Sequence, residues 1–203
     1  MLYLEFNGEN DLLNNKYKGE LLSRYTYSVF LAGPTRRNSP FSKSWRHEAV
    51  KIIKQNDFIE DSDLKVYIPE CRNDNDIFDS SIEGLHRQHI WEWEHLKDAS
   101  YILFWIPRNV EDGMPAFTTN IEFGYWIAYD NERVILGYPK DAEKMDYIDD
   151  LYQEFGAEYG RGYVIKHTLE DTIGVLFDLI HRACDRRPNY IHPYISTHWE
   201  NFD

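Results

Sequence analysis

Cysteine and long apolar runs are both scarce in this chain. The two cysteines, Cys71 and Cys184, lie far apart and form no CxxC pattern, so a disulfide framework or a cysteine zinc site is not expected. No apolar run approaches the roughly 20 residues that a bilayer crossing needs. Residues 1–5 also lack the basic segment and long apolar core of a signal peptide. We therefore expect a cytoplasmic protein with free thiols and no membrane association.

Positive charge is scarce as well. There are 22 Lys and Arg residues against 35 Asp and Glu, which gives a net charge of −13. A nucleic-acid polymer is not expected as a partner, because binding its phosphates needs a basic surface. A small anionic ligand is still an open alternative, because the neighbouring Arg36 and Arg37 can attract an anion locally despite the negative net charge of the chain. Paired arginines on a loop are, however, more often simply solvated.

Several catalytic and cofactor-binding motifs are missing. GxGxxG, GxxxxGK[ST], HExxH and GxSxG do not occur, which disfavours dehydrogenases, kinases and ATPases, zinc proteases and serine hydrolases. The helical segment 85–98 does contain His86, His89, Glu92 and His95 at three-residue steps. Such steps drift around a helix, so the four side chains cannot converge on one ion. We expect no metal and no organic cofactor.

The pattern that is present alternates strands with helices. At 203 residues, 42% of them hydrophobic, the chain suits one domain spanning 1–203, with a peripheral lead-in at 1–25 and an aperiodic tail at 187–203. The alternation predicts an α/β fold: a flavodoxin-like, five-stranded parallel sheet with helices on both faces. Strands are predicted at 27–32, 64–68, 101–106, 133–137 and 163–166, and helices at 42–55, 82–98, from 118 or 119, at 144–155 and at 168–184.

The stretch 107–129 is the strongest candidate for chemistry. Pro107 ends a buried strand, a loop follows, and Thr118 or Thr119 is predicted to cap a helix with Glu122 in its first turn. The helix dipole alone favours an acidic residue there. However, this helix is otherwise largely apolar, and a carboxylate among apolar groups is costly to place. The position therefore indicates a functional reason.

A second carboxylate comes from the preceding helix. Glu92 lies on or beside the buried stripe that includes Leu85 and Leu96. Two carboxylates in one pocket would suit glycosyl chemistry, in which one attacks an anomeric carbon and another helps the leaving group depart. Asp98 lies where this helix meets the next strand, and fixing that junction explains it as well as catalysis does. At the end of the first buried strand, Gly33 allows a close backbone approach.

Several segments in order resemble the nucleoside 2-deoxyribosyltransferase superfamily. They are Phe30–Thr35, Leu96–Ala99, Phe104–Pro107 and Thr119–Gly124, and the resemblance covers roughly residues 27 to 137. It implies transfer of 2-deoxyribose between nucleobases, with retention of the anomeric configuration and without a cofactor. It also implies a homo-oligomer that acts on a nucleoside or nucleotide and a free nucleobase.

The resemblance also implies roles for particular residues. Glu122 is similar to the nucleophile that forms a covalent 2-deoxyribosyl intermediate, and Glu92 occupies the place of a carboxylate that contacts the substrate. Gly33 and Pro34 resemble the loop after the first strand that borders the sugar and base, whereas Asn120 and Phe123 are neighbours of Glu122 by position only. Together with Thr35, Asp98 and Pro107, these residues are our expected substrate-binding positions.

Two other functions stay open at this point. If water replaces the second base, the protein is an N-glycoside hydrolase of nucleosides or nucleoside 5′-monophosphates. The same fold could also serve as a non-catalytic nucleotide-binding or sensor module. A solvent-exposed Glu122, or one held in an ion pair away from any cavity, would favour the module.

Overall fold

A parallel five-stranded sheet forms the centre of the protein. The computed structural model describes residues 2–5, 27–36, 41–56, 64–70, 81–158 and 164–185. The strand order is β1-β3-β2-β4-β5, and every neighbouring pair is parallel. The strands are β1 (Leu2–Glu5), β2 (Tyr27–Ala32), β3 (Leu64–Ile68), β4 (Tyr101–Trp105) and β5 (Val134–Gly137).

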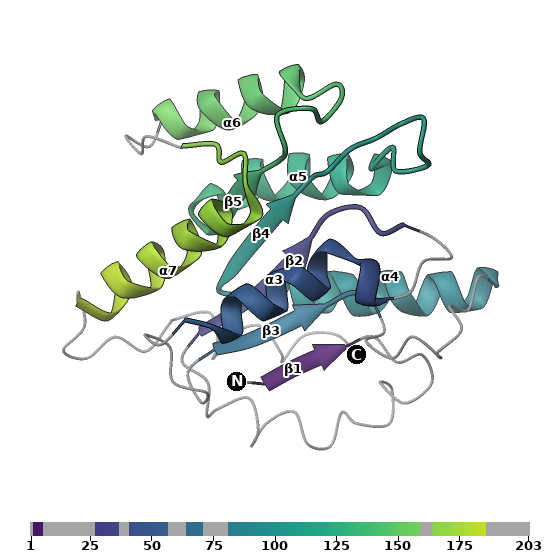
Figure 1. The fold of residues 1–203 in the computed structure, drawn as a ribbon, viewed down its shortest axis with the longest axis horizontal. Helices are drawn as coiled ribbons and strands as arrows, with labels where there is room; N and C mark the ends of the chain where they lie inside the picture. Colours follow the sequence, from purple (N-terminus) through teal and green to yellow (C-terminus); the bar gives the residue numbers. More distant parts are fainter. Residues whose placement is uncertain are drawn as a thin grey trace, which may run out of the picture.

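Helices cover both faces of this sheet (Figure 1). On one face, α4 (Ile82–Asp98), α5 (Phe117–Tyr129) and α6 (Asp146–Glu158) pack in an apolar cluster that includes Phe30, Phe104 and Phe123. On the other face, α3 (Trp45–Lys54) and α7 (Leu169–Asp185) pack in a cluster that includes Val29 and Leu103. Because both faces are covered, β2, β3 and β5 are buried along their whole length, which explains why their residues are apolar apart from Ser28 and Lys65. The predicted fold class is confirmed.

One predicted strand is wrong, and the sheet reaches five strands by another route. The strands expected at 27–32, 64–68, 101–106 and 133–137 are present. In the described part of 163–166, only Lys166 forms a bridge, to Gly137. Since α7 begins at Leu169, the chain has to turn onto the face of the sheet within three residues. The fifth strand is β1, which pairs with the outer edge of β3. It lies in the predicted peripheral lead-in, where the alternation of residues 1–6 is typical of a short strand.

Two helix starts also differ from the prediction. Helix α3 begins at Trp45 with Ser44, not Ser42, as its cap, because a 3-10 turn (Phe41–Lys43) precedes it. Helix α5 begins at Phe117 after Ala116, whose φ of 59° is left-handed, and no side chain caps it. The bridge between Asn109 and Met114 closes the loop and delivers the chain to the helix earlier than a threonine cap would. Glu122 is therefore in the second turn, where the helix dipole has largely faded.

No helix among the described residues combines the length and apolar composition of a membrane span. The tail at 187–203 lies outside the described residues, and the single-domain organisation stays a prediction.

Candidate active site

The candidate site lies at the carboxyl ends of β2 and β4. From β2 the chain moves outward to β3, whereas from β4 it moves the opposite way to β5. In open α/β sheets such a reversal leaves a crevice where ligands bind. Gly33 follows β2 there, with a φ of 148° that side chains rarely adopt, and a Cβ on it would lie 2.2 Å from the Trp105 carbonyl oxygen. Only glycine fits where these two strand ends meet.

Two carboxyl groups from different helices lie near enough to Arg46, beside this crevice, for their charges to act on it. Glu122 comes from α5 and Glu92 from α4; we call them the carboxyl pair. Burial raises the pKa of Glu122 to about 8, the Glu92 charge adds to the rise, and Arg46 opposes it. Burial likewise raises the pKa of Glu92 to about 7, against a hydrogen bond from Gln88 and the charge of Arg46. Near neutral pH the pair can therefore hold one proton between its members, which provides an acid and a base in one place.

The cation facing this pair, Arg46, was not among the predicted site residues. Its guanidinium donates from Nε to the Leu31 carbonyl oxygen (2.9 Å), from Nη2 to that of Gly33 (2.6 Å) and from Nη1 to Thr35 Oγ1 (2.8 Å). Nη1 also lies 3.7 Å from Glu70 Oε1. The sequence carried a signal for this placement, because Arg46 is in helical register with the buried Ala49, Val50 and Ile53. A charged residue on a buried helix face needs partners, and here the site supplies them.

A cleft of about 500 Å³ lies beside Glu70, a volume within the range typical of small-molecule sites. Arg46, Glu92 and Glu122 are not among the residues that line it. Glu70 links the cleft to Arg46, and the exposed Arg36 forms an ion pair with Asp112 at its border. Arg37 lies outside the described residues. The cleft combines charged groups with an indole and hydroxyls; it is lined by Arg36, Ser42, Lys43, Ser44, Trp45, His47, Glu48, Glu70, Pro107 and Met114.

The other predicted binding residues divide into two groups. Pro34, whose carbonyl oxygen accepts from Trp45 Nε1 at 3.0 Å, and Thr35 belong to the loop held by α3, and Pro107 lines the cleft. Asn120 accepts a hydrogen bond from Arg108, which also donates to the Lys144 carbonyl oxygen at 2.6 Å. This arginine thereby ties the start of α5 to the loop after β5.

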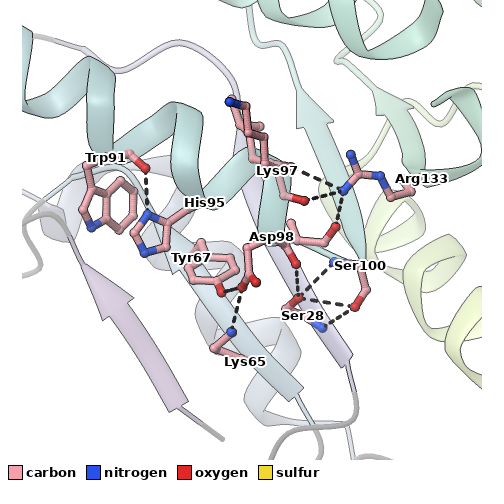
Figure 2. Close-up of polar contacts among 11 residues, drawn as sticks. Ser28, Lys65, Tyr67, Trp91, His95, Lys97, Asp98, Ser100 and Arg133 are labelled. Atoms are coloured by element: carbon pink, nitrogen blue, oxygen red, sulfur yellow. Dashed lines mark hydrogen bonds and ion pairs between the residues drawn. The ribbon is translucent and has the colours of Figure 1, made fainter. Parts of the chain in front are cut away.

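Phe123 and Asp98 do not join the site. The Phe123 side chain is 1% exposed and packs edge-on against Phe104, with ring centroids 5.3 Å apart, so it is a core residue. Asp98 lies at the opposite edge of the sheet, where it binds Lys65 (3.0 Å) and Tyr67 (Figure 2). Burial opposes ionisation of Asp98, but the Lys65 charge and the Tyr67 hydroxyl bring its pKa below the usual value.

The same contacts explain what Asp98 does. Ser28 and Ser100 exchange hydrogen bonds beside it, and Arg133 donates to the last carbonyl groups of α4 (Figure 2). Asp98 therefore fixes the end of α4, which is the junction role that the sequence left open. Elsewhere on this helix, His86 and His89 are exposed. Within the described residues, no group of three His, Cys, Asp or Glu side chains is arranged to hold a metal ion.

Comparison with known families agrees with this geometry. The family model described as "Nucleoside 2-deoxyribosyltransferase like" matches residues 26–141. The match covers more than half of the chain and includes β2 to β5, the crevice and the carboxyl pair. No curated protein matches the chain. The chain belongs to the nucleoside 2-deoxyribosyltransferase-like family.

Proposed function

We propose that this protein is a nucleoside 2-deoxyribosyltransferase, which moves 2-deoxyribose from one nucleobase to another. The observation that carries the proposal is the carboxyl pair, two partly buried groups from different helices whose pKa values are raised and whose charges act on Arg46 beside the crevice. Carboxyl groups with strongly raised pKa values beside a crevice at the strand ends mark candidate catalytic residues.

In the first step, the carboxyl pair reacts in the form that has its proton on Glu92, which is the less populated one-proton form because Glu122 has the higher pKa. The Glu122 carboxylate of this form attacks C1′ of a 2′-deoxynucleoside. The C1′–N bond breaks, its electron pair goes to the base, and protonated Glu92 supplies the proton that the departing base needs. The sugar is left as an ester of Glu122. The absence of a 2′-hydroxyl makes an oxocarbenium-like centre easier to form, so preference for deoxyribose is expected.

In the second step, the nitrogen of an incoming base attacks C1′ from the face that the first base left. Its proton goes to Glu92, and Glu122 departs as a free carboxylate. Two inversions give net retention, and both carboxyl groups return to their starting protonation states. The 5′-phosphate requirement stays open in this scheme, because it depends on the charged cleft beside Arg36 rather than on the carboxyl pair.

The surroundings of Glu122 favour an enzyme over a binding module. Its side chain is partly buried, and the charges of Glu92 and Arg46 act on its carboxyl group. A module that only binds a neutral sugar gains nothing from keeping two acidic groups together, because each raises the energy of ionising the other. Hydrolysis uses the same first step, and the acceptor alone decides between transferase and hydrolase.

The test is a chromatographic assay of purified protein with deoxynucleosides and deoxynucleoside monophosphates, each with and without a second free base. Exchange of bases that is lost in Glu122→Gln, but kept in the exposed-site control Glu154→Gln, would support the transferase. Release of base at the same rate without an acceptor would instead establish a hydrolase. No turnover of any substrate by the wild type would refute both and leave a binding module.

The roles within the carboxyl pair can be separated with an activated substrate. A p-nitrophenyl 2-deoxyriboside has a leaving group that departs without protonation, so it bypasses the proposed acid but still needs the nucleophile. We expect Glu92→Gln to regain activity with this substrate, whereas Glu122→Gln should stay inactive. Equal loss in both variants would contradict the assigned roles.

We further propose that the enzyme is a homo-oligomer, assembled through the outer face of α5. Phe117, Ile121, Tyr125 and Tyr129 recur there at four-residue steps, and each is more than half exposed. Together they offer about 400–500 Å² of largely apolar surface per copy, so two copies facing each other approach the roughly 1,000 Å² of a specific interface.

Charge also favours a second copy as the occupant. The only charged side chain of α5 is Glu122, and the four exposed residues of this face carry no charge. The face therefore avoids the repulsion expected between two chains of net charge −13. Sedimentation of wild type and Ile121→Asp tests the proposal: the variant should shift to monomer. An oligomer that is unchanged in the variant, or a monomeric wild type, would contradict it.

A further inference from the structure

Arg46 is the most completely engaged charged side chain described near the candidate site. It is 1% exposed, and its three hydrogen bonds all end on the segment from Leu31 to Thr35. The neighbouring Trp45 also holds this segment, through its hydrogen bond to the Pro34 carbonyl oxygen, and the Arg46 guanidinium lies 4.5 Å from the centre of the Trp45 ring. The start of α3 thus fixes the loop after β2 in one conformation, and Gly33 permits the close contact that this requires.

Arg46 also has acidic groups around it from three elements. Glu70, just after the end of β3, is 3.7 Å away, and the charges of Glu92 on α4 and Glu122 on α5 act on the guanidinium as well. Ser44, the cap of α3, donates a hydrogen bond to Glu70 and receives one from the Arg46 backbone N–H. One buried cation therefore faces three carboxyl groups, and removal of any one charge must change the balance among the rest.

We propose that Arg46 is a positioning residue for the reaction: it holds the Leu31–Thr35 loop in place and balances the negative charge of the carboxyl pair. The part concerning the reaction rests on the proposed function. The guanidinium is suited to both tasks because its planar fork can bond several oxygens at once and stays charged even when buried. A lysine would keep the charge but lose the fork.

This inference can be tested on the carboxyl groups themselves. In protein labelled with ¹³C at the glutamate side chains, NMR titration follows the carboxyl pair without requiring turnover. We expect Arg46→Gln to move the titration of the pair to higher pH by about one unit or more, since a nearby positive charge is lost. Glu70→Gln removes a neighbouring negative charge and should move it to lower pH. A purely structural role for Arg46 predicts no shift in either variant, and that result would overturn the proposal.

Kinetics then test the positioning half. Arg46→Lys should leave the pH midpoints of kcat/KM close to those of wild type but lower its maximum at least tenfold, because the loop loses its anchor. If Arg46→Gln does not fold, Glu70→Gln and Arg46→Lys still decide the question. Arg133→Gln is the matched control, because this arginine also donates to backbone carbonyl groups, but to those at the C-terminal end of α4, away from the site. The variant should not move the pH midpoints of kcat/KM.

The two proposals can fail separately. NMR shifts in the expected directions in a protein with no turnover would leave Arg46 as the balancing charge and refute the transferase. Turnover in wild type, with unchanged titration in both Arg46→Gln and Glu70→Gln, would keep the transferase and refute the role given to Arg46.

Discussion

Replacing Glu122 with glutamine should make the protein more stable at alkaline pH. Burial raises the pKa of this carboxyl group from 4.5 to about 8 in the folded protein. The folded state therefore holds the proton more tightly than the unfolded state does. The contribution to stability is complete below about pH 4.5 and is lost as the pH rises toward 8. Above that range the wild type carries an ionised buried carboxylate, which the neutral amide of Glu122→Gln avoids.

The size of the effect follows from the shift. Each pKa unit corresponds to about 1.4 kcal/mol, so a rise of this size sets a ceiling of about 5 kcal/mol. The amide needs hydrogen-bond partners of its own, and Glu92 ionises more easily once its neighbour is neutral, so we expect about 2 kcal/mol. For a chain of this length that amounts to a rise in Tm of about 4–8 °C at pH 8.5. At pH 5 the difference should be within about 0.5 kcal/mol.

Thermal unfolding followed by circular dichroism, from pH 5 to pH 9, measures this directly. The control is Glu154→Gln on α6, the same exchange at an exposed position, and its unfolding curves should follow those of wild type at every pH. If Glu122→Gln were less stable than wild type at pH 8.5, or if the two had the same dependence on pH, the burial and charge environment described for Glu122 would be wrong. Such stabilisation with loss of activity is the expected trade-off at an active site.

Three further outcomes are expected. In wild type, kcat/KM should have a narrow bell-shaped pH profile with apparent pKa values near 7 and 8, because the reaction needs one proton on the carboxyl pair. A profile that is flat between pH 6 and 9 would contradict the requirement for a single proton. Asp98→Ala should destabilise the fold by about 2–3 kcal/mol in urea unfolding, since Lys65 is left buried without this partner, whereas KM should change less than twofold. Gly33→Ala should lower kcat/KM by at least tenfold and the stability by about 2 kcal/mol, because the new Cβ meets the Trp105 carbonyl oxygen; an unaffected variant would show that the loop can move away.

Local sequence patterns were sufficient for the layers of the fold. The apolar runs that became β2, β3, β4 and β5 indicate burial on both faces whatever the strand order, because the hydrophobic effect depends on composition and period. Glu122 could also be found from its neighbours alone, since a carboxylate in a largely apolar helix is costly unless it has a function. The family resemblance added the chemistry, and the family match over residues 26–141 agrees with it.

Only the tertiary structure decided which side chains meet. Glu92 and Asp98 are six residues apart on one helix, so they lie about 9 Å apart along its axis. Because α4 runs antiparallel to the strands, this separation puts Glu92 near the carboxyl edge and Asp98 at the amino edge. Likewise, Arg46 looks like an ordinary helical arginine until α3 docks on the sheet and buries it against Leu31 and Gly33. Contacts between distant segments depend on strand order and helix packing, and no short stretch of sequence encodes either one.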